Sequence, residues 1–278
     1  MTLKIVTDST ITIAPELIED LGITIVPLSF SIDGVIYTDG DLSLADYMNK
    51  VDAAENLPKT SQPPVGIFAD MYQSLVADGS SVLSIHMTDT LSGTVEAARQ
   101  GAMLTDGTVE VVDSFFTDQG LAFQVLEAAR LAKAGKELPE VLSAIAQVRE
   151  NTRLWAGVAT LENLIKGGRI GRVTGMIGNF LDLKVILELD NKELKQIAKG
   201  RGNKTFKKWL DETAEAIAAS GRKVKEIGIS HVENLEFAET MRATLQKFVE
   251  KPIQILETTP IIATHTGRGA WALMFYYE

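Results

Sequence analysis

The chain has 278 residues, of which 45% are hydrophobic and 23% are charged, a composition typical of a globular protein with a sizeable core. Its 27 basic and 37 acidic residues give a net charge of −10, which disfavours binding to nucleic acid or to anionic membranes. It contains no cysteine and three histidines, which excludes disulfides and thiolate metal sites and disfavours a histidine-rich metal centre. The N-terminal residues MTLKIVTDST lack the apolar core of a signal peptide, so we expect a cytoplasmic protein without a membrane span.

Three segments of the first half share one order, in which a short apolar run leads through a polar turn into a helix-like stretch. The apolar runs cover residues 3–6, 81–85 and 109–112, and the helix-like stretches cover residues 14–21, 95–104 and 119–134. This order is typical of a parallel sheet with helices on its faces. Such sheets bind ligands beyond the carboxyl ends of their strands, so we expect the polar turns to share one edge.

The pattern changes after a further helix expected over residues 139–150, and a second domain is expected to begin near Asn151. Strands are expected at 153–159, 185–189, 193–198, 226–230, 253–258 and 271–277, and helices at 160–166, 204–219 and 235–249. The two strands around Asp190-Asn191-Lys192 form a hairpin, which makes the second sheet mixed. The predicted fold is therefore α/β with two domains, a parallel-sheet α/β/α domain at 1–150 and a mixed-sheet α/β domain at 151–278.

The hydroxyl residues of the turns have two interpretations. Ser and Thr are preferred helix N-caps, and capping is the favoured role for Ser9, Thr10 and Ser114. The turn Leu91-Ser92-Gly93-Thr94 favours a ligand instead, because Gly93 would let an anion approach the free N–H groups of a helix start. This turn is predicted to cradle an oxyanion.

Two further segments have a structural interpretation and a ligand-binding interpretation that are equally favoured. The stretch 59–64, which includes Thr60 and Ser61, offers two hydroxyls and an amide just before a helix that starts with proline. His265 lies in the segment 264–269, which its glycines predict to be a loop, and its imidazole could donate a hydrogen bond to an anion. The other two histidines, at the ends of predicted strands, are expected to be structural.

Basic residues cluster in the second half of this acidic chain. They are Arg169, Arg172, Lys184, Arg201, Lys204, Lys207 and Lys208. A solvated surface would explain them, but local positive charge in a chain of net charge −10 indicates an anionic partner or a phosphate.

Six motifs in this sequence resemble, in order and spacing, those of the DegV family of bacterial fatty-acid-binding proteins. They are Thr7-Asp8-Ser9-Thr10, Lys59-Thr60-Ser61-Gln62-Pro63, Leu91-Ser92-Gly93-Thr94, Asp113-Ser114, the segment 164–171 with its Lys-Gly-Gly-Arg-Ile sequence, and Thr264-His265-Thr266-Gly267. The resemblance spans the whole chain. Two positions depart from the family pattern: Pro64 replaces a small hydroxyl residue, and Asn203 replaces a second arginine after Arg201.

The resemblance implies two α/β domains that enclose one long-chain fatty acid near their junction. It assigns the ligand to Thr60, Ser61, Ser92, Gly93, Thr264 and His265. It also implies a non-catalytic role without a cofactor, in which the protein presents the carboxylate of the acid to a separate fatty acid kinase subunit that forms acyl phosphate from ATP. Arg169 and Arg201 would then face the kinase or its phosphates.

General physical chemistry is consistent with this implication. Burial of an acyl chain contributes about 0.8 kcal/mol per methylene, so a dozen methylenes supply roughly 10 kcal/mol before association costs. A carboxylate removed from water needs several charge-assisted hydrogen bonds, and the hydroxyls, helix N–H groups and histidine of the turns could provide them.

Two rival functions use the same residues. A hydrolase would have Ser92 as nucleophile, His265 as base and Asp8 or Asp113 as the orienting acid, but Ser92 lacks the Gly-x-Ser-x-Gly elbow. A nucleotide or phosphosugar binder would use the helix start at Gly93, but the sequence has no Walker or dinucleotide glycine pattern.

Overall fold

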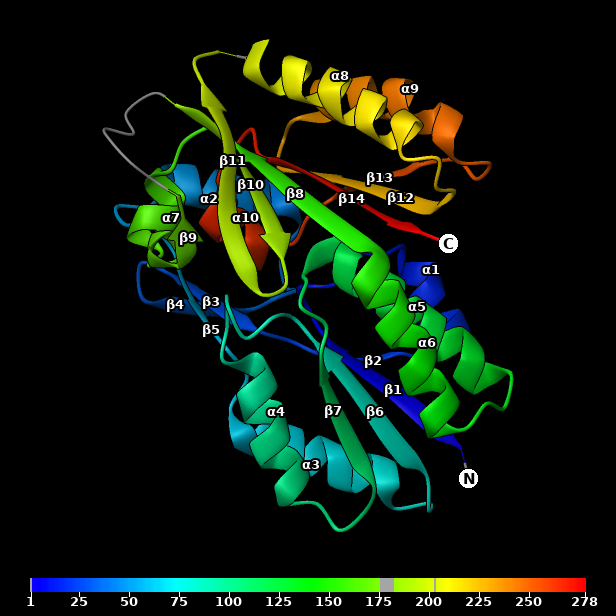
Figure 1. Ribbon diagram of the computed structural model, residues 1–278. Helices are drawn as coiled ribbons and strands as arrows, with labels where there is room; N and C mark the ends of the chain where they lie inside the picture. The colour runs from blue at the N-terminus through cyan, green and yellow to red at the C-terminus, as the bar shows by residue number, and fades with distance from the viewer. Residues whose placement is uncertain (1, 176–182, 203) are drawn as a thin grey trace.

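The computed structural model describes residues 2–175, 183–202 and 204–278 (Figure 1). Its strands form a four-stranded parallel sheet, a seven-stranded mixed sheet and a small three-stranded antiparallel sheet. The predicted α/β class with a parallel and a mixed sheet is confirmed. Position 203, where the sequence departs from the family pattern, lies outside the described residues.

The parallel sheet has the order β2-β1-β6-β7 and is covered by helices on both faces. Its strands are β2 (Thr24–Val26), β1 (Leu3–Asp8), β6 (Ser81–His86) and β7 (Val109–Asp113). Its helices are α1 (Pro15–Leu21), α3 (Val65–Val76), α4 (Thr94–Met103), α5 (Asp118–Lys133) and α6 (Leu138–Asn151). Side chains alternate along each strand, so Ile5 and Leu83 pack in the core shared with α5, whereas Val6 and Val82 pack with α3 and α4.

The mixed sheet has the order β13-β12-β14-β8-β10-β11-β9. Its strands are β8 (Thr152–Val158), β9 (Val173–Thr174), β10 (Lys184–Asp190), β11 (Glu193–Gly200), β12 (Val224–His231), β13 (Gln254–Glu257) and β14 (Trp271–Tyr277). The remaining elements of this half are α7 (Glu162–Lys166), η1 (Ile170–Arg172), α8 (Lys204–Ala219), α9 (Leu235–Leu245), η2 (Gln246–Phe248) and α10 (Pro260–Thr266). Helices α8 and α9 cover its outer face, where Trp271 and Phe275 form part of an aromatic core (Figure 1).

Helix α5 lies between the two large sheets (Figure 1). Leu121 and Val125 pack toward the parallel sheet, while Phe123 packs in the core of the mixed sheet beside Tyr276. A helix that is apolar on nearly all sides is expected to be buried in this way. The domain boundary near residue 151 stays a prediction, because α5 contacts strands of both halves and α6 contacts β14.

The segment from residue 24 to residue 61 holds elements that the sequence pattern did not predict. After β2 come β3 (Ser29–Ile32), β4 (Val35–Thr38), α2 (Leu44–Ala53) and β5 (Lys59–Ser61). The three strands after β2 form the antiparallel sheet β4-β3-β5. Strands of three or four residues are too short to show a clear hydrophobic alternation. No helix in the described ranges is long and apolar enough to cross a membrane.

Candidate ligand-binding site

A cavity of about 1040 Å³, counted to its opening, lies where the three sheets meet. Its wall is mostly apolar, and much of it comes from leucines on the inner face of the mixed sheet. These are Leu154, Leu187, Leu189 and Leu194. A cavity with this lining suits a hydrocarbon better than a nucleotide or a phosphosugar, whose polar groups would need partners along the wall.

Five of the residues predicted to face a ligand or its phosphates lie together at the solvent-facing end of this cavity. We call this set the mouth cluster; it consists of Thr60, Ser61, Ser92, Arg169 and His265. Thr60 and Ser61 end strand β5, and Ser92 directly precedes the N-cap of α4. Ser61 is solvent-exposed and the other four are partly buried, so the cluster marks the opening of the cavity.

His265 lies on helix α10, so the predicted loop over 264–269 is wrong in its first half. Pro260 begins this helix and Gly267, with φ of +75°, ends it; seven residues were too few to show a helical period. Nε2 of His265 lies 2.9 Å from Oγ1 of Thr60. Burial, together with the charge of Arg169, lowers the pKa of His265 to about 4, so the imidazole is neutral at pH 7.

Arg169 lines the cavity, whereas the family resemblance implied a residue that faces the kinase or its phosphates. Its guanidinium donates from Nε to the carbonyl of Leu91 at 3.3 Å and from Nη1 to the carbonyl of Gly167 at 2.7 Å. Among the described residues no carboxylate lies within ion-pair distance of it. Burial, and then the nearby charge of Arg172, lower the pKa of Arg169. The mouth cluster therefore carries a half-buried cation that lacks an anion.

Three other predicted site residues lie elsewhere. Thr264 is buried at 1% exposure, and its hydroxyl lies 2.7 Å from that of Tyr47, so it holds α10 rather than lining the cavity. Gly93 is the N-cap of α4, and the side chain of Gln62 occupies the space where a Cβ would project. Arg201 is exposed after β11 and is not part of the cavity wall.

The predicted capping role of three turn hydroxyls is wrong. The N-caps of α1 and α5 are Ala14 and Thr117. The hydroxyl of Ser9 instead donates to Asp39, that of Thr10 donates to Asp8, and that of Ser114 donates to the carbonyl of Phe116. Ser9 thus satisfies a buried carboxyl of another segment, whereas Thr10 and Ser114 satisfy buried groups two residues away in their own turns.

The serine and histidine of the hydrolase hypothesis are each bonded to another residue. The Ser92 hydroxyl lies 2.9 Å from Oγ1 of Thr94 and accepts from the Thr94 amide at 3.3 Å. His265 contacts Thr60, as described above. A serine nucleophile needs a base within hydrogen-bond reach, and neither contact supplies one to Ser92.

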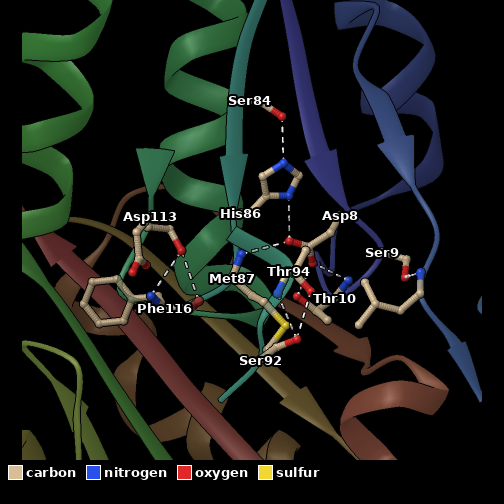
Figure 2. A network of polar contacts seen from close by, with 12 residues as sticks. Asp8, Ser9, Thr10, Ser84, His86, Met87, Ser92, Thr94, Asp113 and Phe116 are labelled. Atoms are coloured by element: carbon tan, nitrogen blue, oxygen red, sulfur yellow. Dashed lines mark hydrogen bonds and ion pairs between the residues drawn. The ribbon is translucent and has the colours of Figure 1, made fainter. Parts of the chain in front are cut away.

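The two aspartates of that hypothesis are also engaged elsewhere (Figure 2). Asp8 contacts Nδ1 of His86 at 3.0 Å, and both side chains are fully buried. Asp113 forms an ion pair of 2.7 Å with Lys192 at the tip of the β10–β11 hairpin. The carboxyl ends of β1, β6 and β7 thus lie at one edge, as predicted, but they do not assemble a catalytic triad around Ser92.

A second polar group, which we call the inner junction, lines the buried side of the cavity. It consists of Asp118, Ser230 and Thr258, which are 2%, 1% and 5% exposed. Asp118 accepts hydrogen bonds from the hydroxyls of Ser230 at 2.6 Å and Thr258 at 2.7 Å, and from the Gln119 amide at 2.7 Å. Burial raises the pKa of Asp118, although these bonds lower it in part. This carboxyl ties the first turn of α5 to the mixed sheet.

Sequence reasoning missed most of the cavity wall. The leucines on β8, β10 and β11 look like ordinary core residues in the sequence, because an alternating strand does not reveal whether its inner face meets a helix or a cavity. The inner junction gave no motif at all. The described residues contain no group of three or more His, Cys, Asp or Glu side chains arranged to hold a metal ion.

Known proteins of similar sequence and fold are consistent with these observations. The family model for uncharacterised proteins of the DegV family matches residues 2–278. A DegV domain-containing protein of Lactococcus lactis is 57% identical over 278 residues, with the whole of both chains covered.

Two solved structures share the fold over their whole length. A DegV family protein of Thermus thermophilus, described as fatty acid binding, has 31% identity and a TM-score of 0.91, with 100% of both chains covered. DegV of Bacillus subtilis, described as a fatty acid binding protein, has 27% identity and a TM-score of 0.90, again with 100% of both chains covered. The match of the family model to almost every residue, together with these relatives, shows that the chain belongs to the DegV family.

Proposed function

We propose that this protein binds one long-chain fatty acid, with the acyl chain in the apolar cavity and the carboxylate at the mouth cluster. The observation that carries the proposal is Arg169, a half-buried cation on the wall of an apolar cavity without a carboxylate partner among the described residues. The fatty acid binding described for the relatives from Thermus thermophilus and Bacillus subtilis supports the same ligand class.

The leucine-rich wall of the cavity supplies the affinity for the acyl chain of the fatty acid. Each buried methylene contributes about 0.8 kcal/mol, so a chain of a dozen or more offsets the cost of association without polar contacts along its length. The mouth cluster supplies the recognition of the head group. Charge-assisted hydrogen bonds from a guanidinium and several hydroxyls compensate a carboxylate that leaves water.

His265 acts on the carboxylate through Thr60. A neutral imidazole has one N–H, and a proton on Nε2 donates to Oγ1 of Thr60 at 2.9 Å. The hydroxyl hydrogen of Thr60 is then free to point at the ligand. This arrangement accounts for a histidine that stays neutral beside an anion-binding site.

The test is mass spectrometry of the purified protein under native conditions, followed by solvent extraction. We expect about one fatty acid per chain in the wild type. Ala156→Phe, which adds a ring to the cavity wall, should purify without lipid, whereas Ile197→Phe at a solvent-exposed position of β11 should retain it. A wild-type protein that repeatedly carries no acyl species, even after incubation with fatty acids, contradicts the proposal.

We also propose that the protein is not itself an enzyme and that, in the cytoplasm, it presents the carboxylate to a separate fatty acid kinase subunit. Support comes from the exposed basic residues around the start of α8, which are Arg201, Lys204, Lys207 and Lys208. Exposed like charges on one surface steer the approach of an acidic partner.

A further inference from the structure

Four buried side chains form a chain of hydrogen bonds on the α3 side of the parallel sheet, and Figure 2 shows three of them, Ser84, His86 and Asp8. The hydroxyl of Tyr72 on α3 donates to Oγ of Ser84 at 2.7 Å, and Ser84 lies 2.7 Å from Nε2 of His86. Nδ1 of His86 lies 3.0 Å from Oδ2 of Asp8. All four side chains have 0% exposure. We call this set the buried relay.

The donors of the relay can be assigned from its two ends. Burial alone would raise the pKa of Asp8, but the contacts with His86, Thr10 and the Met87 amide lower it, so its carboxylate only accepts hydrogen bonds. His86 must then donate from Nδ1. Because Ser84 already accepts from Tyr72, its own hydroxyl hydrogen is free to donate to Nε2 of His86. Each hydrogen bond of the relay thus has one donor and one acceptor.

The relay is not a second catalytic site, although it contains a serine, a histidine and an aspartate. Ser84 and His86 are not part of the cavity wall, and both are fully buried among the strands and α3. A nucleophile must reach a substrate, which this serine cannot do.

The relay joins the three segments that lead to the polar residues of the cavity. Tyr72 belongs to α3, the helix that begins four residues after Ser61. Asp8 ends β1 and accepts from both the amide and the hydroxyl of Thr10, which lines the cavity. It also accepts from the amide of Met87 at 2.8 Å.

That contact at Met87 fixes the start of the turn that carries Ser92. The amides of Leu91 and Ser92 both donate to the carbonyl of Thr88, the residue after Met87. A shift at the end of β6 therefore moves the serine of the mouth cluster. Ligand-binding side chains keep the distances and angles that charge-assisted hydrogen bonds need when the residues beside them are fixed by hydrogen bonds of their own.

From these contacts we infer that Asp8 and His86 are positioning residues for the carboxylate, which set the relative placement of Thr60 with Ser61, Thr10 and Ser92 without touching the ligand. The inference rests on the proposed fatty acid function and gives a role to Asp8, a candidate acid of the hydrolase hypothesis, and to His86, which was expected to be structural.

The experiment compares two variants that change buried carboxyls, Asp8 in the relay and Asp118 in the inner junction. Asp8→Asn breaks the relay, and Asp118→Asn weakens the inner junction, whose partners lie on the mixed sheet. For each variant, dissociation constants are measured for hexadecanoic acid and for 1-hexadecanol, and the free energy of unfolding is measured in urea.

Asp8→Asn should weaken binding of the acid about tenfold relative to the alcohol, because a carboxylate needs several aligned donors. Asp118→Asn should change both affinities alike, with an acid-to-alcohol ratio within about twofold of wild type, because its hydroxyl donors Ser230 and Thr258 are not members of the mouth cluster. Ser84→Ala removes one hydrogen bond of the relay and should change the acid-to-alcohol affinity ratio by about threefold in the same direction. This variant replaces Asp8→Asn in the test if Asp8→Asn does not fold.

An unchanged acid-to-alcohol affinity ratio in every folded relay variant overturns the positioning role. A change of this ratio in Asp118→Asn as large as that in Asp8→Asn also overturns it. If the wild type binds hexadecanoic acid, the proposed function stands even when one of these two results overturns the positioning role. Wild-type protein that binds neither ligand contradicts the proposed function and removes the positioning role with it.

Discussion

The two polar regions of the cavity wall differ in how fully their groups are partnered. At the inner junction, each oxygen of the Asp118 carboxyl accepts from a hydroxyl, one on Ser230 and one on Thr258. At the mouth cluster, Arg169 bonds only to backbone carbonyls and faces no carboxylate in the described chain. Both regions are polar and both adjoin the same apolar cavity.

This difference distinguishes polar groups that stabilise the fold from polar groups that are available to bind a ligand. A buried carboxyl surrounded by hydroxyl donors is satisfied within the fold, so it needs no ligand to explain it. A partly desolvated cation without an anion costs free energy, and an incoming carboxylate recovers that cost. We therefore propose the mouth cluster as the recognition site for the head group, whereas the inner junction ties α5 to the mixed sheet.

Removal of the guanidinium should have the largest effect on ligand binding. Arg169→Met keeps much of the length and apolar stem but loses the charge, and we expect affinity for hexadecanoic acid to fall about 100-fold, or about 2.7 kcal/mol. Affinity for 1-hexadecanol should stay within a few-fold. Isothermal titration gives both values, and Arg172→Met, at an exposed neighbouring position, is the matched control. Equal losses for acid and alcohol would show that Arg169 only supports the fold.

The second prediction concerns Asp39, which helps to hold α10 over the mouth cluster. Burial raises its pKa from 3.8 to about 7, although the Ser9 hydroxyl and the Ile261 amide lower it in part. As the pH rises from about 4 to 7, the unfolded chain releases this proton while the folded chain keeps it, so this group makes stability fall with pH.

Asp39→Asn lacks that titration. The free energy of unfolding of the wild type relative to Asp39→Asn should fall by about 2 kcal/mol between pH 5 and pH 7. Urea denaturation of both proteins at the two pH values measures this difference. The comparison with the variant is necessary because His265, whose pKa is lowered, makes stability rise with pH over part of the same range. A constant difference between the proteins would mean that Asp39 is ionised throughout this range.

Loss of single hydrogen bonds at the mouth should have a smaller effect. Ser92→Ala and His265→Ala should each weaken binding of hexadecanoic acid about tenfold more than binding of the alcohol, because each removes one contribution to the binding of a charged group. Competition with a fluorescent fatty acid measures both ratios. Ser114→Ala, which removes a buried hydroxyl outside the cavity wall, should leave the ratio unchanged. The same ratio change in Ser114→Ala would undermine the assignment of the mouth cluster.

Charge reversal outside the cavity should have the smallest effect on lipid binding. Arg201→Glu should leave the dissociation constant for hexadecanoic acid within about twofold of wild type, because isolated exposed charges contribute about 0 to 1 kcal/mol. With a fatty acid kinase subunit and ATP, the same variant should form acyl phosphate more slowly, and added salt should slow the wild type in the same way. Undiminished acyl phosphate formation would remove Arg201 from the docking surface.

The long elements of both halves could be predicted from the sequence because their apolar spacing is local. The strand at Leu3–Asp8 and the helix at Asp118–Lys133 differ from prediction by two residues or fewer at either end. Some short elements could not be predicted, since Ser29–Ile32 and Pro260–Thr266 hold too few residues for a period to show.

The site was predictable to the extent that its residues occur in motifs. Thr60, Ser92 and His265 were predicted to bind the ligand because hydroxyls, a glycine and a histidine at turns indicate anion binding, and the structure brings them to one cavity. Asp39 and Asp118 were missed because their roles depend on partners more than 100 residues away along the chain, at Ile261 and Ser230. Such long-range pairs leave no local pattern.

The central claim is that a fatty acid carboxylate lies against Arg169, and carbon-13 NMR of bound hexadecanoic acid labelled at its carboxyl carbon tests it most directly. A carboxylate held by a guanidinium and hydroxyl donors should stay ionised below the usual carboxyl pKa of about 4.3, and Arg169→Met should raise that pKa by at least about one unit. A bound carboxyl with a pKa above about 5 in the wild type, or one that Arg169→Met does not change, would place the head group away from the mouth cluster and contradict the account.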